Sequence, residues 1–409
     1  MKCRHCSKNL ELCFIDLGTA PPSNSYLNKS QLNNYEKYYP LKVFICNNCW
    51  LAQVIDYAGR DIFFNEFYPY FSSISKSFLE HSRKYVDYVI KRFNLNIKKS
   101  KIIEIASNDG YLLQFFRKKN FNCIGIEPSK SCAEYARARK INVIQEFFDI
   151  NLAKDLIKNK HKSDLIVANN VLAHVPDINN FVKGISLLLK PKGVVTFEFP
   201  HLLELIKNNQ YDTIYHEHYS YLSLLSVKNV FNKNGLKIFD VQQINTHGGS
   251  LRVFAQKKNS NYHKLSKNYL NIYNIEKKYK LNSIKTYKHF QKIADKNKND
   301  LIKFLIDCKT KNLKVAAYGA AAKGNTLLNY AGIKKDLISY VCDSAPSKQN
   351  KFLPGTRIPI YPPEYMFKNK PDYLLILPWN IAEEIMDQLY KLKKDKTKFF
   401  VAIPNIKIL

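Results

Sequence analysis

The sequence lacks the marks of a membrane protein, a secreted protein or a disordered chain. No run among its 409 residues approaches the ~20 consecutive apolar residues of a membrane-spanning helix. The opening segment MKCRHCSKNLELCF has no apolar stretch of the secretory kind, so we expect a cytoplasmic protein without a signal peptide or a membrane partner. Hydrophobic residues still make up 45% of the chain, which excludes general disorder. The length predicts two or three domains.

Acidic residues are also scarce. The 34 Asp and Glu residues stand against 64 Lys and Arg residues, which gives a formal net charge of +30. Such an excess suits nucleic acid or a phosphorylated substrate. The lysines are spread through almost every segment and form no basic arm, so we expect no nucleic-acid partner. Attraction of a small phosphorylated ligand remains compatible with this charge.

The nine cysteines are an odd number, which argues against a disulfide framework in a cytoplasmic chain. Four of them form two CxxC pairs, and a two-residue spacing lets both sulfurs reach one tetrahedral zinc ion. We therefore predict a closed, structural zinc site with the ligands Cys3, Cys6, Cys46 and Cys49. A redox pair or two coincidental CxxC sequences are the alternatives. The nearby Cys13 is expected to stay unligated.

Strands and helices alternate from residue 101 onward, which is typical of a parallel, doubly wound sheet. A lysine-, asparagine- and tyrosine-rich helical region begins near residue 258, and a second α/β unit begins at LKVAAYGAAAKGNTLL. We predict an α/β protein with a small N-terminal zinc-binding subdomain, a central Rossmann-like domain with a parallel-rich sheet, and a second Rossmann-like domain. The predicted bounds are 1–62, 63–257 and, for the helical connector with the C-terminal domain, 258–409.

A cofactor signal follows the first two predicted strands of the central domain. Small residues in the first turn let the backbone approach an adenosyl ligand, and an acid that ends the second strand can accept both ribose hydroxyls. The sequence has no G-x-G-x-x-G, and an acidic residue that opens the turn suits the positively charged S-adenosylmethionine. Another nucleotide, or no cofactor, are the alternatives. The candidate residues are Glu104, Ala106, Asn108, Gly110 and Glu127.

A second group of polar residues suggests proton chemistry. His174 lies in NVLAHVPD, and YDTIYHEHYSY carries Tyr215, Glu217 and His218. Imidazole takes a proton near neutral pH, a carboxylate can orient it, and a tyrosine hydroxyl can hold a carbonyl oxygen as it becomes an enolate. H-E-H is not H-E-x-x-H, so we expect no helical zinc site here. A polar loop packed on its neighbours is the alternative.

Two further stretches suggest a phosphorylated substrate. In THGGSLR the two glycines indicate a close backbone approach beside His247, and Arg252 can hold a phosphate or a nearby carboxylate. In the C-terminal unit, GAAAKG opens a helix where backbone amides can hold phosphate near Lys323, and Asp343 ends the next strand as a ribose-binding acid would. The alternative is a vestigial domain that only covers the active site.

These motifs together resemble a known family. The CxxC pairs, IEIASNDGYLL, LAHVPD, YDTIYHEHYSYLS, THGGSLRV and LPGTRIPI occur in the order found in the S-adenosylmethionine-dependent sugar C-methyltransferases of deoxysugar and surface-polysaccharide biosynthesis. The resemblance covers nearly the whole chain. It implies methylation at carbon 3 of a nucleotide-diphosphate 4-keto-6-deoxy sugar. Ala106 departs from the glycine usual in that family, which slightly crowds the cofactor turn.

The resemblance also implies roles for particular residues. His218 would be the base, helped by His174, Tyr215 and Glu217, while Tyr70, Ser75 and Asn170 would line the cofactor pocket. Two other classes stay open on the sequence. One is a zinc-containing nucleic-acid methyltransferase, which only the net charge favours. The other is an NAD-linked or non-enzymatic sugar-modifying protein that uses the C-terminal fold.

Overall fold

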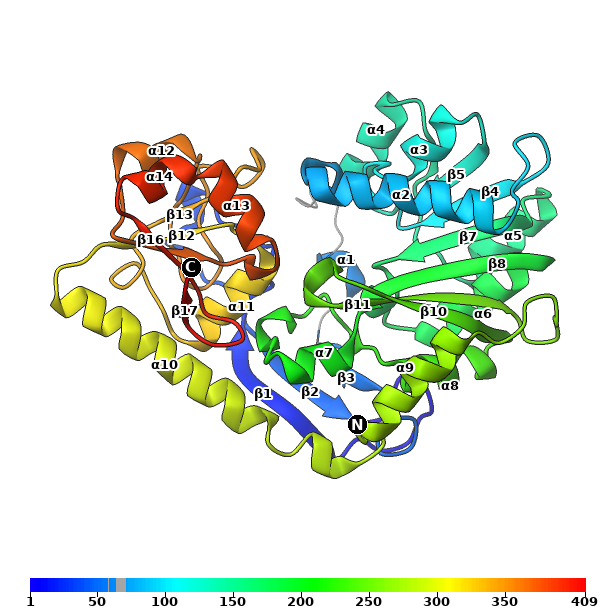
Figure 1. Cartoon of the computed structure of the whole chain (residues 1–409), viewed down its shortest axis with the longest axis horizontal. Helices are drawn as coiled ribbons and strands as arrows, with labels where there is room; N and C mark the ends of the chain where they lie inside the picture. Colours follow the sequence, from blue (N-terminus) through cyan, green and yellow to red (C-terminus); the bar gives the residue numbers. More distant parts are fainter. Residues whose placement is uncertain (58, 64–70) are drawn as a thin grey trace.

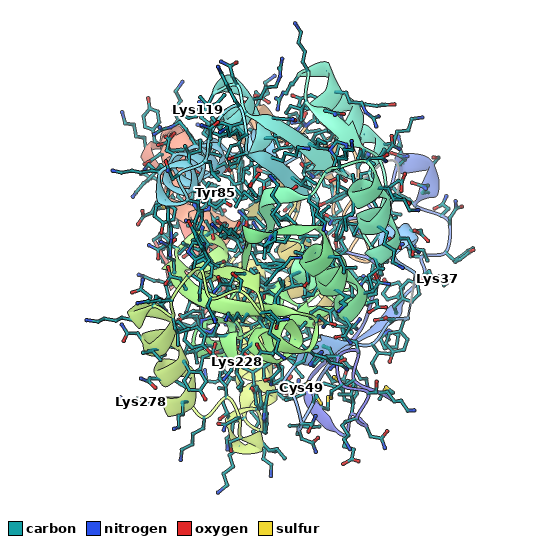
Figure 2. The ribbon with its side chains drawn as sticks, turned by 90° about the vertical axis from the view of Figure 1, so that its right-hand side faces the viewer. Lys37, Cys49, Tyr85, Lys119, Lys228 and Lys278 are labelled. Carbon is teal, nitrogen blue, oxygen red and sulfur yellow. The ribbon has the colours of Figure 1, made fainter. Side chains whose placement is uncertain are left out.

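The computed structural model describes residues 1–57, 59–63 and 71–409. In Figure 1 the central domain and the C-terminal domain form two lobes, and the N-terminal strands lie below and between them. Within the described ranges, no helix is long and apolar enough to cross a membrane. In Figure 2, Lys37, Lys119 and Lys278 project at different edges of the molecule, which agrees with a basic charge that is spread over the surface.

The central domain is a seven-stranded sheet in the order β10-β11-β8-β7-β4-β5-β6. The run from β6 to β8 is parallel, as the alternating strands and helices predicted. Buried apolar runs build these strands, and such runs are typical of parallel strands covered on both faces. The strands are β4 Lys101–Ile105, β5 Asn122–Ile126, β6 Asn142–Ile144, β7 Ser163–Asn169, β8 Leu189–Pro200, β10 Leu236–Ile244 and β11 Ser250–Lys257.

Helices cover both faces of this sheet (Figure 1). They are α2 Lys76–Arg92, α3 Leu113–Lys118, α4 Lys130–Ala138, α5 Ile150–Lys158, α6 Ile178–Leu188 and α8 Leu224–Lys233. The short helix α7 Leu202–Lys207 instead packs into the apolar core beside the N-terminal sheet. The antiparallel hairpin β10–β11 at one edge was missed by the sequence analysis. Its turn contains Thr246–Gly249 and is longer than the two-residue turns that reveal hairpins in a sequence.

The N-terminal sheet has the order β1-β2-β3-β9, from β1 Leu12–Ala20, β2 Tyr39–Ile45, β3 Ala52–Val54 and β9 Ser220–Tyr221. Its last strand, β9, comes from the middle of the chain and lies just after the YHEH segment. Ala52 pairs with Tyr221, and Gln53 pairs with Ser220. The N-terminal sheet therefore holds one end of the segment that carries His218. The short helix α1 Arg60–Phe63 follows β3.

The C-terminal domain is a six-stranded sheet, parallel except for β17, and confirms the predicted second α/β unit. Two helices, α9 Lys267–Lys278 and α10 Phe290–Thr310, lead into it. Its elements are β12 Val315–Tyr318, β13 Val341–Cys342, β14 Ile360–Tyr361, β15 Tyr373–Ile376, β16 Lys398–Val401, β17 Lys407–Ile408, α11 Ala322–Tyr330, α12 Glu364–Lys368, α13 Ala382–Gln388 and α14 Tyr390–Lys394. One apolar core joins β1 to α10 and α11, which fixes this domain against the N-terminal sheet.

Candidate active site

The four predicted zinc ligands come together. The sulfurs of Cys3, Cys6, Cys46 and Cys49 all lie within 4.8 Å of one another. The Cys3 sulfur lies 3.5 Å from that of Cys49, and the Cys6 sulfur lies 3.4 Å from that of Cys46, so cysteines of different CxxC pairs are in contact. A zinc ion with four Zn–S bonds of about 2.3 Å needs such an interleaved, tetrahedral set. The thiols therefore fit a closed structural zinc site, and Cys13 is exposed outside the cluster.

The zinc knuckle also anchors a loop of the central domain. The Arg4 guanidinium donates to the Pro176 carbonyl at 2.8 Å and pairs with Asp56 at 2.7 Å. His5 Nδ1 lies 2.8 Å from Asn179 Oδ1. Pro176 belongs to the loop between β7 and α6, which also carries His174. The zinc knuckle therefore supports the loop that carries one of the predicted catalytic residues.

The predicted cofactor turn after β4 is tightly wound. Ala106, Asn108 and Gly110 all have positive φ, at 57°, 49° and 78°. A Cβ on Gly110 would meet Ile141 Cδ1 at 2.2 Å, so only glycine fits there without a shift. Ala106 adopts the same left-handed backbone conformation, which costs about 1 kcal/mol for a residue with a Cβ and would cost glycine nothing. The turn is further held by Glu127, which accepts the Asn108 amide at 2.9 Å.

Polar groups around this turn fit a polar ligand. Among the described residues, the side-chain amide of Asn170, Oδ1 of Asp109 and Oγ of Ser107 are buried without a hydrogen-bond partner. Burial raises the pKa of both Glu104 and Glu127, and Glu104 lies one strand residue before the turn. Orphaned buried polar atoms are costly unless a ligand satisfies them. These groups therefore fit S-adenosylmethionine, which brings amine, carboxylate and ribose partners.

The segment before α2 closes over the same turn. The Ser72 amide donates to Asn108 Oδ1 at 2.9 Å, and Ser73 hydrogen-bonds Asp109 through both its amide and its hydroxyl. Ser75 instead caps α2, since its hydroxyl accepts the Phe78 amide at 3.2 Å. Tyr70 lies outside the described residues. Sequence reasoning placed this stretch near the cofactor but did not find the Ser72 contact.

The four predicted catalytic residues meet where β7 and the 211–221 segment approach. His218 Nδ1 lies 2.9 Å from the Thr213 carbonyl, which can only accept, so Nδ1 carries the proton. Nε2 of the neutral ring is then an acceptor, and the Tyr215 hydroxyl donates to it at 2.8 Å. His174 Nδ1 donates to the Glu217 carbonyl at 2.9 Å, and its ring lies 4.6 Å from that of His218.

Both imidazoles are held neutral. Burial lowers the pKa of His218 well below its ordinary value, and the neighbouring His174, His247 and Lys323 lower it further. Burial also lowers the pKa of His174 to about 4, against an opposing hydrogen bond to the Glu217 carbonyl. A neutral imidazole with a fixed tautomer can accept a proton at neutral pH. The arrangement is suited to general-base chemistry at Nε2 of His218.

One partner of the Glu217 carboxylate was not foreseen. Asn24, from the segment after β1, donates its side-chain amide to Glu217 Oε1 at 2.6 Å. Two residues further on, the Tyr26 hydroxyl donates to the Ala320 carbonyl at 2.5 Å, just before α11. No local pattern in PPSNSYL reveals these contacts, because the partners are 193 and 294 residues away.

Arg252 is used inside the protein. Its guanidinium pairs with the buried Glu198 at 2.6 Å and lies 4.8 Å from the Tyr85 ring. Of the two partners considered for Arg252, the structure shows the carboxylate. Glu198 also pairs with His81 at 2.9 Å. His247 has a left-handed φ of 54°, and burial, together with the charge of Lys323, lowers its pKa to about 4.

The C-terminal domain brings Lys323 toward the histidines but uses Asp343 differently. The Lys323 ammonium hydrogen-bonds Asn380 and lies 4.7 Å from the Trp379 ring. Burial lowers the pKa of Lys323 to about 8, which the charge of Asp212 opposes. Asp343 accepts the backbone amides of Ala320 and Ala345 at 2.7 and 2.8 Å. The structure thus places Asp343 against the turn that precedes α11.

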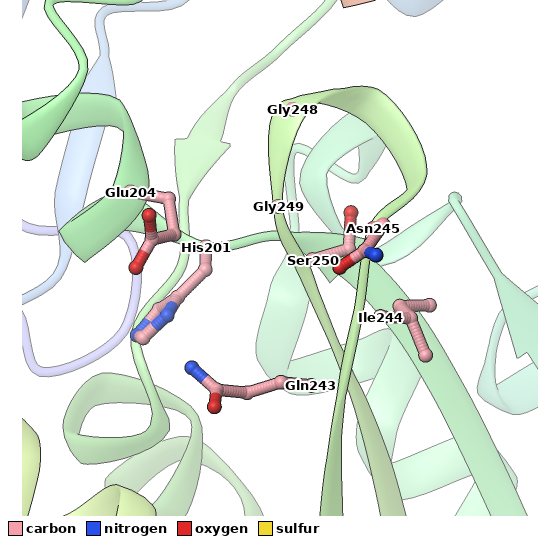
Figure 3. A pocket seen from close by; sticks show the side chains of 8 residues that line it. All are labelled: His201, Glu204, Gln243, Ile244, Asn245, Gly248, Gly249 and Ser250. Atoms are coloured by element: carbon pink, nitrogen blue, oxygen red, sulfur yellow. The ribbon is translucent and has the colours of Figure 1, made fainter.

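A pocket of about 320 Å³ opens behind the β10–β11 turn. In Figure 3, Gln243 extends toward His201 across this pocket. None of its lining residues is a predicted site residue, although Gly248 directly follows His247. The lining residues are His201, Glu204, Gln243, Ile244, Asn245, Gly248, Gly249 and Ser250. The predicted catalytic residues cluster around His218 and do not line this pocket.

Comparisons with known proteins match each part of the chain. Family models match residues 3–64 as a zinc binding domain, 78–241 as a methyltransferase domain and 245–404 as a C-methyltransferase C-terminal domain. The C-methyltransferase NovU of Streptomyces niveus is 32% identical over 408 residues, which covers 100% of this chain and 96% of NovU. A ubiquinone biosynthesis O-methyltransferase of Pelagibacter ubique is 28% identical over 110 residues, covering 27% of this chain and 45% of the relative.

Among solved structures, the magnesium protoporphyrin IX methyltransferase of Synechocystis with bound S-adenosylmethionine is similar at 13% identity and a TM-score of 0.35. That match covers 46% of this chain and 82% of the other. The fold and the site define a zinc-binding methyltransferase that uses S-adenosylmethionine. The full-length match to NovU shows that the chain belongs to its C-methyltransferase family, so the atom methylated is a carbon.

Proposed function

We propose that this protein methylates carbon 3 of a nucleotide-diphosphate 4-keto-6-deoxy sugar in deoxysugar biosynthesis. The observation that carries the proposal is the oriented, neutral His218 imidazole with its Tyr215 partner. A C-methyltransferase needs a carbon nucleophile, and the accessible one is the enolate formed by removing a proton beside a carbonyl. The acceptor is therefore a ketone, and the resemblance to sugar C-methyltransferases supports the 4-keto sugar.

The proton step uses groups on one short segment. Nε2 of His218 takes the proton from carbon 3, and the C–H electron pair moves into the enolate. The Thr213 carbonyl then stabilises the charged ring through Nδ1–H. The single lone pair of Nε2 accepts one proton at a time, so the Tyr215 hydroxyl turns from Nε2 to the substrate oxygen at carbon 4 before the proton moves, and donates to that oxygen as it becomes the enolate. Asn24 holds the Glu217 carboxylate, and the backbone carbonyl of Glu217 fixes the His174 ring.

The methyl donor supplies an electrophilic methyl group when it is bound. We assign its site to the turn Ala106–Gly110, to Glu127 and to the side chains of Asn170 and Glu104. The unpartnered Asn170 amide and Asp109 Oδ1 support this assignment. The chain would contribute by holding the enolate carbon ~3 Å from the methyl group in a buried site.

We assign the nucleotide diphosphate to the C-terminal domain, residues 258–409, with the donor in residues 63–257 and zinc in residues 1–62. Lys323 stands in the first turn of α11, where helix amides and an ammonium group favour a phosphate. Its charge lies close enough to His247 and His218 to lower the pKa of both rings. A phosphate held by Lys323 would therefore lie near His218.

The test is incubation of the purified protein with S-adenosylmethionine and a panel of nucleotide-diphosphate 4-keto-6-deoxy sugars, followed by mass spectrometry. We expect one methyl group added at carbon 3. Without the donor, we expect deuterium from solvent to enter the same position, because proton removal precedes methyl transfer. Methylation at an oxygen, or of a nucleic acid only, would overturn the proposal.

Lys323 predicts an alkaline limit to substrate capture. Its ammonium is charged below a pKa of about 8, so kcat/KM for the nucleotide sugar should fall above that pH as the charge is lost. Lys323→Gln should raise KM about tenfold or more because the charge-assisted contact is lost. The fall of kcat/KM above about pH 8, the alkaline limb of the pH profile, should also disappear in this variant. Lys323→Arg keeps its charge at all these pH values, so its profile should stay flat through pH 9. A wild-type limb that persists in Lys323→Arg would contradict the assignment.

A further inference from the structure

Trp379 reaches from the C-terminal domain into the catalytic segment of the central domain. It follows β15, and its indole N–H donates to Asp212 Oδ2 at 2.7 Å. The same ring fills the space beside Gly248, where an added Cβ would lie 2.3 Å from Trp379 Cη2. The Gln210 side-chain amide donates to the Gly248 carbonyl at 2.8 Å. The indole thus lies against both the segment that precedes the YHEH motif and the turn that carries His247.

Asp212 depends on this contact. It is fully buried, and its other oxygen, Oδ1, has no hydrogen-bond partner within the described part of the chain. Burial raises the pKa of Asp212 to about 6, while the charge of Lys323 and the Trp379 hydrogen bond oppose the rise. The backbone amides of Asp212 and Thr213 also hydrogen-bond this carboxylate, so Trp379 and the turn share the same acceptor.

The neighbour of Asp212 sets the state of the base. Asp212 and Thr213 belong to the same 3₁₀ turn, Tyr211–Thr213, and the Thr213 carbonyl accepts the Nδ1 proton of His218. A displaced turn would release that proton and let the ring rotate or change tautomer. Lys323 lies over the same indole and bonds the next residue, Asn380, so the contact also adjoins the proposed phosphate site.

We propose that Trp379 is a positioning residue for proton abstraction: through Asp212 it holds the Tyr211–Thr213 turn, and thereby the tautomer of His218. The C-terminal domain then contributes directly to the chemical step, beyond binding a nucleotide or covering the site. This inference rests on the proposed function, in which His218 is the base.

The test compares Trp379→Phe, which keeps an aromatic ring but removes the N–H donor, with the wild-type protein. We expect kcat to fall at least about tenfold, in line with the loss of a hydrogen bond to a charged group. KM for both substrates should stay near the wild-type value. Solvent deuterium exchange at carbon 3 should fall by the same factor as kcat, because the defect is in proton removal. A kcat equal to the wild-type value, or a loss confined to KM, would overturn the inference.

Asp212 supplies a matched pair of variants. Asp212→Asn retains an oxygen that accepts the indole proton, so it should keep most of the wild-type exchange rate. Asp212→Ala removes the acceptor and should lose as much as Trp379→Phe, with little further loss in the double variant. An equal loss of the exchange rate in Asp212→Asn and Asp212→Ala would overturn the inference. This comparison holds even if the Trp379→Phe protein does not fold. A wild-type protein that exchanges and methylates no keto sugar would instead refute the proposed function.

Discussion

Replacing His218 with asparagine is expected to lower kcat by about 10³-fold, because general-base catalysis contributes about 10²–10⁴. Asparagine can still donate to the Thr213 carbonyl, so the segment should keep its shape. Solvent deuterium exchange at carbon 3 should disappear together with methyl transfer, because both need the same proton acceptor. The measurement is steady-state kinetics together with exchange followed by mass spectrometry.

The matched control is His216→Asn, in the same H-E-H triplet. His216 is directed toward the N-terminal sheet, where its Nε2 lies 3.2 Å from the Tyr39 carbonyl. The His216→Asn protein should keep most of the wild-type kcat, although it is expected to melt at a lower temperature. Exchange that survives in His218→Asn at the wild-type rate would show that another group is the base.

The pH dependence follows from the same environment. The folded-state pKa of His218 is lowered well below 6.5, and that of His174 to about 4, so the proposed base stays neutral as the pH falls through the ordinary histidine value. We expect no acid limb near the ordinary histidine value. The free energy of unfolding, in contrast, should decrease as the pH falls below about 6.5, because the histidines take up protons in the unfolded chain but not in the folded protein. Melting temperatures measured at each pH separate the two effects.

Loss of the zinc ion is expected to unfold the N-terminal knuckle and with it the active site. Cys46→Ser should lower bound zinc below one ion per chain and reduce the free energy of unfolding by about 3 kcal/mol or more, because the metal's binding energy is folding energy. Arg4 anchors the loop that carries His174, and His5 anchors the start of α6 directly after it, so methyl transfer should fail as well. Zinc content and thermal melting check this expectation.

Cys13 provides the control for the zinc site. It lies in β1 of the same sheet but is exposed and outside the four-cysteine cluster. Cys13→Ser should therefore retain zinc, stability and activity. A Cys46→Ser protein with full zinc content and the wild-type melting temperature would contradict a four-cysteine site.

The sequence by itself determined the parts of this protein that depend on neighbours along the chain. The buried strands after residue 101, the small-residue turn at Ala106–Gly110 and the two CxxC pairs each result from local composition and spacing. The CxxC geometry brings two sulfurs together whatever lies between the pairs. The resemblance of the motifs extended this to the C-methyltransferase family, which the full-length relative confirms.

Only the tertiary structure decided how the polar side chains are used. Arg252 forms an ion pair with Glu198, and Asp343 accepts the Ala320 amide in the turn before α11, although the sequence allowed a substrate role for each. Asn24 reaches Glu217 across 193 residues, and Trp379 reaches Asp212 across 167. Such pairs leave no local pattern, because they form only when separate sheets pack against one another. The histidine proposed as the base is visible in the sequence, but its tautomer and its lowered pKa are created by this packing.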